Sequence, residues 1–586
     1  MRAVRVIGAA AEFEDRPDGT ILVRSPRALA AYPDKLTERL DHWAAVAPQR
    51  TFLARRGADG EWIRLSYAET QRRARAIAQA LIDRGLSYEK PLAILSGNSL
   101  EHGLLALGAM YAGVLYAPIA PAYSLAVQQF DTLRHLWDSF RPALVFADDR
   151  SRFERALNAM PLDGVEVVNS ESFAALESVE ATAAVDAAHA RVTPDTVAKI
   201  LFTSGSTGRP KGVITTQRML CSNQEMIRAS MQFLRDEPPV LCDWLPWNHT
   251  FGGSHNFGIA LYNGGSLYID DGRPTAAAFD ETARNLREIA TSAYFNVPKG
   301  FEMLVQRMRT DETLRRTFFS KVQVLFYAAA GLSQHVWDEL QELAVTACGE
   351  NILMMTGLGS TESAPAALFT GIEGAASGLI GLPLPGVEMK LAPVGGKVEA
   401  RLRGPLITPG FWRDEALTRA SFDEEGFYRM GDAVRFADPG NRLAGFRFDG
   451  RLNEDFKLST GTWVSAGPLR MKLLAHFGSL AQDVVLVGPD RDYLTAMIVP
   501  GAGASPGEIR TALQVLAQSA TGSSTQVRRA VILTELPSIE AGEMTDKGSL
   551  NQRAMRERRA ALVEALYADA PPSHVICVQE GIGASL

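Results

Sequence analysis

Residues 203–212 bring together the hydroxyls, glycines and lysine that a phosphate site needs. The segment contains four hydroxyl side chains, three glycines and Lys211. Hydroxyls, an ammonium and the N–H groups that glycines leave accessible all donate to phosphate oxygens. The segment differs from the GxxxxGK[ST] loop, because Gly212 follows Lys211 and the glycines are spaced differently. It predicts a phosphate-binding loop of another class. The residues expected to bind are Thr203, Ser204, Gly205, Ser206, Thr207 and Gly208.

Lysine is rare in this chain, so each lysine is more informative than usual. There are 11 lysines and 49 arginines within the Lys+Arg total of 60. A compact ammonium and a planar guanidinium are not interchangeable, so lysine is expected where a site requires it. Lys211, Lys457 and Lys547 are therefore candidates for functional roles.

Apolar runs and helical patterns alternate through the first half of the chain. Ser66 and Glu69 form a capping-box pattern, and the apolar face that follows predicts a helix ending at Gly85. The alternation is the βαβ pattern of parallel sheets. The further elements expected are a strand at 92–95, a helix at 100–112, strands near 115–119, 143–146 and 200–202, and a helix after 215.

Polar, glycine-bearing segments follow several predicted strands. They are residues 203–212, 246–249, 328–331 and 356–362. Ligands of open α/β sheets bind beyond the carboxyl ends of the strands, so we expect these segments to share one crevice.

The composition of the chain changes after about residue 371. Short strands with Gly and Pro turns predict a small β subdomain over 371–450, and a boundary near Gly450 follows. Strands at 484–487 and 494–499 and a helix at 554–568 predict a separate α+β unit. The predicted fold class is α/β. It has a large domain, 1–450, of parallel-rich sheets sandwiched by helices, and a small C-terminal domain, 451–586.

Charge and cysteine content exclude several classes of protein. A net charge of −7 gives no general attraction to polyanions, which argues against nucleic acid as a partner. The four cysteines show no CxxC pair, so neither a disulfide framework nor a zinc cluster is indicated, and a reducing cytoplasm fits. The uncharged stretch 103–127 is long enough to span a bilayer, but Gly113, Pro118 and Pro121 divide it into shorter pieces. We therefore expect a cytoplasmic protein with no membrane partner.

The segment 203–212 resembles the signature of the adenylate-forming superfamily of acyl-CoA synthetases, luciferase-like enzymes and peptide-synthetase adenylation domains. Further matching motifs follow in order over most of the chain. They are Trp247-Asn248-His249-Thr250-Phe251-Gly252, Ala328-Ala329-Ala330-Gly331, Gly359-Ser360-Thr361-Glu362, Tyr428-Arg429-Met430-Gly431-Asp432, Gly450-Arg451 and Thr545-Asp546-Lys547-Gly548.

Three longer strings, residues 218–224, 454–464 and 544–551, most resemble feruloyl-CoA synthases. The resemblance implies an ATP-dependent acid:CoA ligase that converts a ferulate-like hydroxycinnamate through an acyl-adenylate to its CoA thioester. Another aryl or aliphatic acid, or transfer of the acyl group to a separate carrier protein, is the alternative. A regulatory phosphate-binding module without turnover is a third hypothesis. Lys547 together with Glu362 argues against it, because a binder needs no cation from a second domain.

The resemblance also implies ATP, Mg²⁺ and the co-substrate CoA, and roles for the matched residues. Glu362 would hold Mg²⁺, since a hard cation prefers carboxylate oxygens, and Thr361 would donate to the α-phosphate. Lys547 would bridge the carboxylate and the α-phosphate in the first half-reaction, with Lys211 as a further catalytic cation. His249 would line an acyl pocket whose other walls are residues 247–253, 294–298 and 329–331.

The remaining implied contacts are with the nucleotide and with CoA. Asp432 would accept hydrogen bonds from the ribose hydroxyls, as acidic residues do in other nucleotide sites. The other residues expected near the nucleotide are Ala330, Gly331, Gly359, Ser360 and Arg451. Lys457 lies in the region that relatives present during the second half-reaction.

Lys457 and Lys547 belong to the small domain, whereas Glu362 and the phosphate loop belong to the large one. The site must therefore be completed across a domain gap. In the family the small domain rotates between half-reactions, and the pivot is expected at Asn453, a residue type that tolerates unusual dihedrals. The oligomeric state is left open, a homodimer included.

Overall fold

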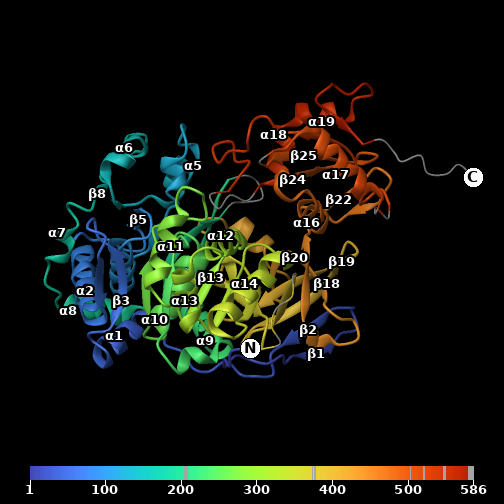
Figure 1. The fold of residues 1–586 in the computed structure, drawn as a ribbon. Coiled ribbons are helices and arrows are strands. Elements are labelled where there is room, and N and C mark those ends of the chain that lie inside the picture. Colours follow the sequence, from blue (N-terminus) through green and yellow to red (C-terminus); the bar gives the residue numbers. More distant parts are fainter. Residues whose placement is uncertain are drawn as a thin grey trace, which may run out of the picture.

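The computed structural model describes residues 1–203, 209–372, 374, 376, 378–501, 503–518, 520, 522–545 and 550–578. These residues form a large α/β body and, after residue 450, a smaller α+β unit (Figure 1). In Figure 1 the smaller unit, orange to red, lies above the large body. The α/β fold class predicted from the sequence is confirmed.

The largest sheet has 11 strands in the order β1-β2-β18-β19-β20-β21-β17-β16-β15-β14-β13. Strands β13, β14 and β15 are parallel, and the other neighbours are antiparallel. The strands predicted for the β subdomain, β17 to β21, thus continue the sheet of β13 to β16, and the N-terminal β1 and β2 extend it. The bounds are β1 (Glu12–Asp15), β2 (Ile21–Arg24), β13 (Ala293–Asn296), β14 (Val324–Tyr327), β15 (Leu353–Gly359), β16 (Ala366–Phe369), β17 (Leu379–Pro383), β18 (Glu388–Val394), β19 (Lys397–Arg403), β20 (Tyr428–Phe436) and β21 (Phe446–Arg451).

A six-stranded sheet, in the order β10-β9-β6-β5-β7-β8, carries the predicted βαβ alternation. Its neighbours are parallel except β9 and β10, which form an antiparallel hairpin around the segment expected to bind phosphate. A four-stranded sheet has the order β11-β12-β3-β4. The bounds are β5 (Leu92–Leu95), β6 (Tyr116–Pro118), β7 (Leu144–Ala147), β8 (Glu166–Val168), β9 (Val197–Thr203), β10 (Lys211–Thr216), β3 (Thr51–Arg56), β4 (Trp62–Ser66), β11 (Val240–Asp243) and β12 (Ser266–Ile269).

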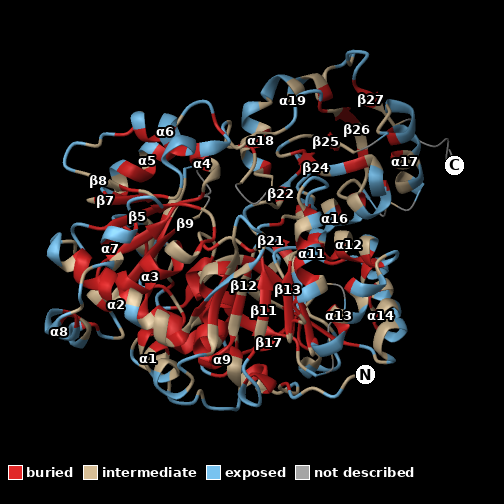
Figure 2. Ribbon diagram, turned by 60° about the vertical axis from the view of Figure 1, so that its left-hand side comes forward, coloured by how far each residue is buried: buried red, intermediate tan, exposed pale blue. Residues whose placement is uncertain are grey.

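Strands β5, β7, β13, β14 and β16 are buried along their whole length, whereas the edge strand β1 is mostly exposed (Figure 2). Helices α11 to α14 pack on one face of β13 to β15, and the other face packs against the segment around Phe251 and Phe257. The bounds are α1 (Thr37–Val46), α2 (Tyr67–Asp83), α3 (Leu100–Ala112), α4 (Ala122–Leu125), α5 (Asp131–Phe140), α6 (Arg150–Asn158), α7 (Ala174–Glu177), α8 (Ala183–Arg191), α9 (Gln217–Ser230), α10 (Phe257–Tyr262), α11 (Phe279–Glu288), α12 (Pro298–Met308), α13 (Glu312–Lys321), α14 (Gln334–Cys348) and α15 (Glu415–Ala420).

Two local predictions can be checked residue by residue. Ser66 caps α2, with its Oγ accepting the Glu69 N–H at 3.2 Å. The uncharged stretch 103–127 forms most of the buried helix α3, then β6 and α4, as its glycine and prolines predicted. In the described part of the chain, no helix has both the length and the apolar character needed to cross a membrane.

The C-terminal unit is built on a sheet in the order β24-β25-β26-β27 with helices on both faces. Leu486, Ala496 and Ala530 pack toward α16 and α17, while Val485, Met497 and Val531 pack toward α18 and α19, which is the period-2 alternation of strands. The bounds are β22 (Phe456–Lys457), β23 (Trp463–Val464), α16 (Ala466–Phe477), β24 (Ala481–Val487), β25 (Leu494–Pro500), α17 (Pro506–Gln518), β26 (Val527–Ile532), α18 (Gln552–Arg558), α19 (Ala560–Tyr567) and β27 (Ile576–Cys577).

The prediction of one continuous helix over 554–568 is wrong, because the structure has two helices there. The segment breaks at Arg559, between α18 and α19, and the guanidinium of Arg559 pairs with Glu543 at 2.7 Å and Glu535 at 2.6 Å.

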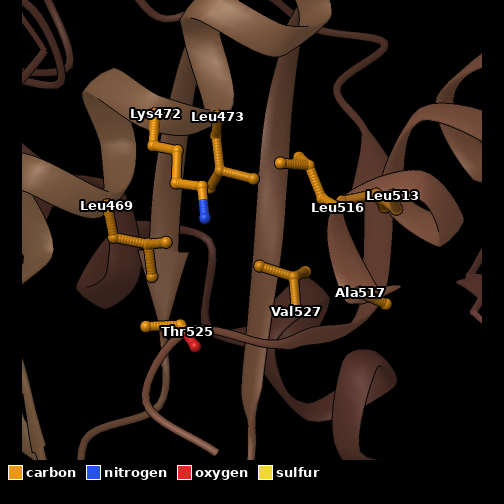
Figure 3. Close-up of a pocket in the computed structure, with 8 residues that line it drawn as sticks. All are labelled: Leu469, Lys472, Leu473, Leu513, Leu516, Ala517, Thr525 and Val527. Carbon is orange, nitrogen blue, oxygen red and sulfur yellow. The ribbon is translucent and has the colours of Figure 1, made fainter. Parts of the chain in front are cut away.

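On the opposite face of the C-terminal sheet, Leu469 and Leu473 of α16 meet Leu516 of α17 and Val527 of β26 around a cavity of about 10 Å³ (Figure 3). That cavity is too small for anything larger than a water molecule.

Candidate functional site

Lys211 and Glu362 form an ion pair between two sheets. Lys211 begins β10 opposite Thr203 of β9, so it lies where the β9–β10 hairpin opens toward residues 204–208. Its Nζ lies 2.8 Å from Oε1 of Glu362 and 4.3 Å from the centroid of the Phe411 ring. The predicted phosphate-binding residues Ser204, Gly205, Ser206, Thr207 and Gly208 lie outside the described residues.

Glu362 is held as an anion in a buried position. It lies in the 3-10 helix η3 (Thr361–Ser363), directly after β15, and only 6% of its surface is exposed. Burial favours the neutral acid, but the charge and hydrogen bond of Lys211 outweigh it and lower the pKa of Glu362 below its ordinary value. Burial and the neighbouring Glu362 both raise the pKa of Tyr428, so that phenol stays protonated beside the carboxylate.

The donor set at Glu362 fits magnesium bound together with a polyphosphate. Mg²⁺ in nucleotide sites usually takes one or two protein carboxylates and several substrate oxygens. Glu362 supplies one buried, ionised carboxylate, and no group of three or more His, Cys, Asp or Glu residues that could hold a metal occurs in the described ranges. The residues therefore suit a metal brought by the nucleotide rather than one held by the protein alone.

Asp432 and Arg451 lie on neighbouring strands of the same region. They face each other across β20 and β21, with Nε of Arg451 3.6 Å from Oδ1 of Asp432. Burial raises the pKa of Asp432 to about 6, the charge of Arg451 opposes this rise, and Glu362 adds to it. The Asp432 carboxylate thus lies within electrostatic reach of Glu362.

Two further loops carry predicted nucleotide contacts. Ala330 and Gly331 are exposed after β14, and the preceding Ala329 has φ of 73°. Gly359 ends β15, where a Cβ would lie 1.6 Å from the carbonyl oxygen of Pro365, so only glycine fits. Ser360 and Thr361 follow, and Thr361 is buried. The loops thus place these residues at the ends of adjacent parallel strands, as predicted.

His249 lies just before a π-helix. A π-helix, η2 (Phe251–Asn256), starts two residues after it and runs into α10. The Gly253 N–H donates to the His249 carbonyl at 2.8 Å, and His249 is half-buried. A Cβ on Gly253 would lie 2.1 Å from the Trp247 carbonyl, which explains glycine there. Such π-turns occur frequently at functional sites.

The segment 294–298, predicted as a wall of the acyl pocket, directs its side chains to two different sides of β13. Tyr294 packs in the core against Phe301 and Phe318, with ring centroids 5.7 and 5.0 Å away, and its hydroxyl accepts a hydrogen bond from Asn296 at 2.8 Å. Phe295 instead points to the opposite side of the strand, toward Phe326 at 5.7 Å, in the cluster that contains Phe251.

Of the two C-terminal lysines predicted to act at the site, the structure describes Lys457. Lys457 of β22 is exposed, and its Nζ lies 5.0 Å from the Trp463 ring centroid. Lys547 lies outside the described residues. The predicted pivot Asn453 is exposed in the turn between β21 and β22 and stays a prediction. The C-terminal unit contacts the large body between α4 and α5, where Glu540 accepts from the Gln129 N–H at 3.0 Å.

Sequence reasoning missed two residues beside this site. Lys199 of β9 is buried, and its Nζ donates to the Gly253 carbonyl at 2.8 Å. Gln224 of α9 donates through Nε2 to the carbonyls of Ser254 at 2.8 Å and His255 at 3.2 Å. A lysine inside the apolar run of β9, in a chain poor in lysine, was the available signal for Lys199.

Comparison with known proteins gives the class that this fold and site define. The AMP-binding enzyme family matches residues 40–412. The chain belongs to this family, and thus to the adenylate-forming enzymes, whose common reaction is ATP-dependent activation of a carboxylic acid.

The individual relatives are distant and diverse. A 3-[(3aS,4S,7aS)-7a-methyl-1,5-dioxo-octahydro-1H-inden-4-yl]propanoyl:CoA ligase of Rhodococcus jostii is 25% identical, over 74% of this chain and 82% of its own. The hybrid PKS-NRPS synthetase fsa1 of a Fusarium species is also 25% identical, over 81% of this chain but only 12% of its own. The solved anthranilate CoA ligase AuaEII, in complex with anthranoyl-AMP, superposes with a TM-score of 0.72 at 18% identity, covering 91% and 99% of the two chains.

Proposed function

We propose that this protein is an ATP-dependent acid:CoA ligase that activates a hydroxycinnamate-type aryl carboxylic acid. The observation that carries the proposal is the Lys211–Glu362 pair at the opening of the β9–β10 hairpin, with Asp432 nearby. A cation and a buried anion side by side, next to a hydroxyl-rich loop, suit a metal-bound polyphosphate better than a neutral ligand.

The residues divide the first half-reaction between them. The substrate carboxylate attacks the α-phosphate of ATP, forming acyl-adenylate and releasing pyrophosphate, so catalysis depends on alignment and on stabilising charge at phosphorus. Lys211 and Lys547 supply positive charge to the phosphate oxygens, and Thr361 donates to the α-phosphate. Asp432 accepts from the ribose. Mg²⁺, held by Glu362 and the phosphates, would neutralise charge on the departing pyrophosphate.

The second half-reaction transfers the acyl group to a thiol. The CoA sulfur attacks the adenylate carbonyl, and AMP leaves with the bonding electrons of the acyl–oxygen bond. Lys457, on the C-terminal unit, is the proposed contributor to this step. Rotation of that unit about Asn453 would exchange Lys547 for Lys457 at the site, which is consistent with both lysines lying on the C-terminal side of the turn between β21 and β22.

The substrate class is supported by sequence strings and by the aromatic surroundings of the acyl segment. The feruloyl-CoA synthase-like strings include residues 218–224, whose Asn223 and Gln224 form buried hydrogen bonds to the backbone beside the site. Phe251, Phe295 and Phe326 pack together beside the same turn, and aromatic side chains favour contact with a flat ring. The names of the two ligases reported above specify different acids, so the acid itself must be found by assay.

An acid panel assayed by pyrophosphate release tests the proposal. Ferulate, 4-coumarate, benzoate and a long-chain fatty acid are offered with ATP and Mg²⁺, and thioester formation is followed on adding CoA. The expected result is pyrophosphate release with the hydroxycinnamates and thioester only with CoA. Release with another acid alone would contradict the substrate class, and no release with any acid would contradict adenylation. An acyl-adenylate that CoA leaves unchanged would favour a carrier protein as acceptor.

Glu362→Gln gives the corresponding test of the site. Loss of the buried charge should lower pyrophosphate release by about 100-fold or more, the scale of one lost electrostatic contact in a transition state. Glu339→Gln is the matched control, because Glu339 of α14 is also a glutamate paired with a cation, Arg309 at 2.8 Å, but lies away from the site. Equal activity of both variants would remove Glu362 from the proposed site.

A further inference from the structure

Lys199 is buried, and no carboxylate pairs with it in the part of the chain that the structure describes. It lies in β9 with 2% of its surface exposed. Among the residues that the structure describes, no carboxylate lies within 4.0 Å of its Nζ, and its hydrogen bond goes to the neutral carbonyl of Gly253 at 2.8 Å. A buried cation without an anion is costly, and apolar residues of similar size are usually at least as stable in its place. Stability alone therefore does not explain this lysine.

The surroundings of Lys199 offer no compensation either. The lysine borders a cavity of about 20 Å³ whose lining includes His102, Met110, Tyr116 and Trp247. Burial lowers the pKa of His102 to about 4, and the charge of Lys199 lowers it further. His102 is therefore a neutral imidazole near pH 7 and does not compensate the ammonium charge. Burial likewise lowers the pKa of Lys199 to about 7, a further sign that its ammonium is poorly stabilised.

The carbonyl that Lys199 holds belongs to the π-helix η2. Three successive carbonyls of this helix accept from side chains of other elements: Gly253 from Lys199 of β9, and Ser254 and His255 from Gln224 of α9. The Gly253 N–H in turn donates to the His249 carbonyl. Lys199 thus connects the strand that ends at Thr203, beside the phosphate loop, to the turn that presents His249.

We propose that Lys199 is a positioning residue that fixes the π-turn and His249 against the phosphate-loop strand, so that the acid's carboxylate is aligned with ATP. The inference rests on the proposed function for its kinetic consequence. Its structural part, the fixation of the π-turn, stands on the Lys199–Gly253 contact alone.

Lys199→Met tests both parts, because methionine keeps most of the side-chain volume and removes the donor. For the acid that the panel identifies, kcat/KM should fall by about 10- to 100-fold through a raised KM, while the KM for ATP stays within about twofold. Hydrogen exchange of the amides of residues 251–262 should accelerate, with exchange in β13 to β15 unchanged. Met110→Leu, which alters the same cavity without removing a hydrogen bond, is the matched control and should change neither readout.

The outcomes separate this inference from the proposed function. Wild-type protein that releases no pyrophosphate with any acid overturns the proposed function and, with it, the kinetic part. Unchanged exchange in residues 251–262 of Lys199→Met overturns the positioning role even when the enzyme is active. Equal rises in the KM values for acid and ATP overturn it as well. Should Lys199→Met fail to fold, Lys199→Leu, which also removes the donor, is measured in the same way: accelerated exchange in residues 251–262 supports the proposal and unchanged exchange overturns it.

Discussion

Two buried lysines, Lys390 and Lys199, lie in different regions of the large body and have different partners. Lys390 of β18, 4% exposed, contacts Glu425 at 2.7 Å, pairs with Asp423 and lies 4.7 Å from the Phe427 ring centroid. Lys199 of β9 has a backbone carbonyl as its partner. The first arrangement is what a structural charge requires, since its partners replace the lost water. The second leaves the charge costly, as is common where a side chain serves a site.

The acidic residues of the same two regions repeat the contrast. Burial favours protonation of Asp423, but hydrogen bonds from Lys390, Phe427 N–H and Arg401 outweigh it and lower its pKa to about 2. Asp432, whose nearest cation Nε lies 3.6 Å away, has its pKa raised by burial to about 6. The charge of Asp423 is thus closely compensated, whereas the carboxyl group of Asp432 is opposed by a single, more distant cation.

The largest effect on stability is expected for Lys390→Met. Removing this lysine leaves the side chain of Asp423 buried with only Arg401, at 3.1 Å, as a cationic partner, and breaking such a pair costs about 3 to 5 kcal/mol. Denaturant unfolding should show this loss in the free energy of unfolding. The double variant Lys390→Met/Asp423→Asn should recover part of it. A loss below about 1 kcal/mol would show that the two lysines are not different in kind.

A pH-dependent gain in the free energy of unfolding is expected for Asp432→Asn. The folded-state pKa of about 6 exceeds the ordinary 3.8, so ionising Asp432 costs stability above pH 6 and nothing below about pH 3.8. The variant should be more stable than wild type by up to about 3 kcal/mol at pH 8, with the gain vanishing near pH 4. ATP binding should weaken at the same time. Unfolding at the two pH values and calorimetric titration with ATP check both parts, and a gain independent of pH would contradict the assignment.

A gain in the free energy of unfolding of about 1 to 4 kcal/mol near pH 7 is expected for Lys199→Met. The folded-state pKa of about 7 lies below the ordinary 10.5, so charging Lys199 destabilises the folded protein below pH 7, and this cost fades as the pH rises toward 10.5. Thermal unfolding from pH 6 to pH 10 measures the difference from wild type. A loss of stability at pH 7 would place Lys199 with Lys390 as a structural residue.

Short-range patterns predicted much of the fold and the candidate site. The predicted strand 92–95 and helix 100–112 coincide with β5 and α3, because apolar period and the cap at Gly113 act locally. Lys211, Glu362 and Asp432 were found through residue type and motif. Their common location, however, joins strands of separate sheets, and no local pattern determines which sheets meet.

The π-turn and the break at Arg559 were not predictable in this way. A π-turn uses a wider hydrogen-bond register, and here it depends on the carbonyls of Leu245, Pro246 and Trp247 lying within 2.5 Å of where Cβ atoms on Gly252 or Gly253 would be. Arg559 ends α18 where its guanidinium reaches Glu543, 16 residues earlier in the chain. The π-turn is also held by Lys199 and Gln224, which are 54 and 30 residues from the carbonyls they contact, so both features involve contacts between segments distant in sequence.

The order of residues along the chain sets the chemistry available to this protein: a hydroxyl- and glycine-rich segment with one lysine, and the acidic residues Glu362 and Asp432, in the order of the adenylate-forming motifs. Which charges are closely paired depends on how the strands pack. Whether a buried lysine finds a carboxylate or a bare carbonyl depends on partners distant in the chain, such as Gly253, which is 54 residues from Lys199. Desolvation and pairing act through space, so they are fixed only when the sheets pack.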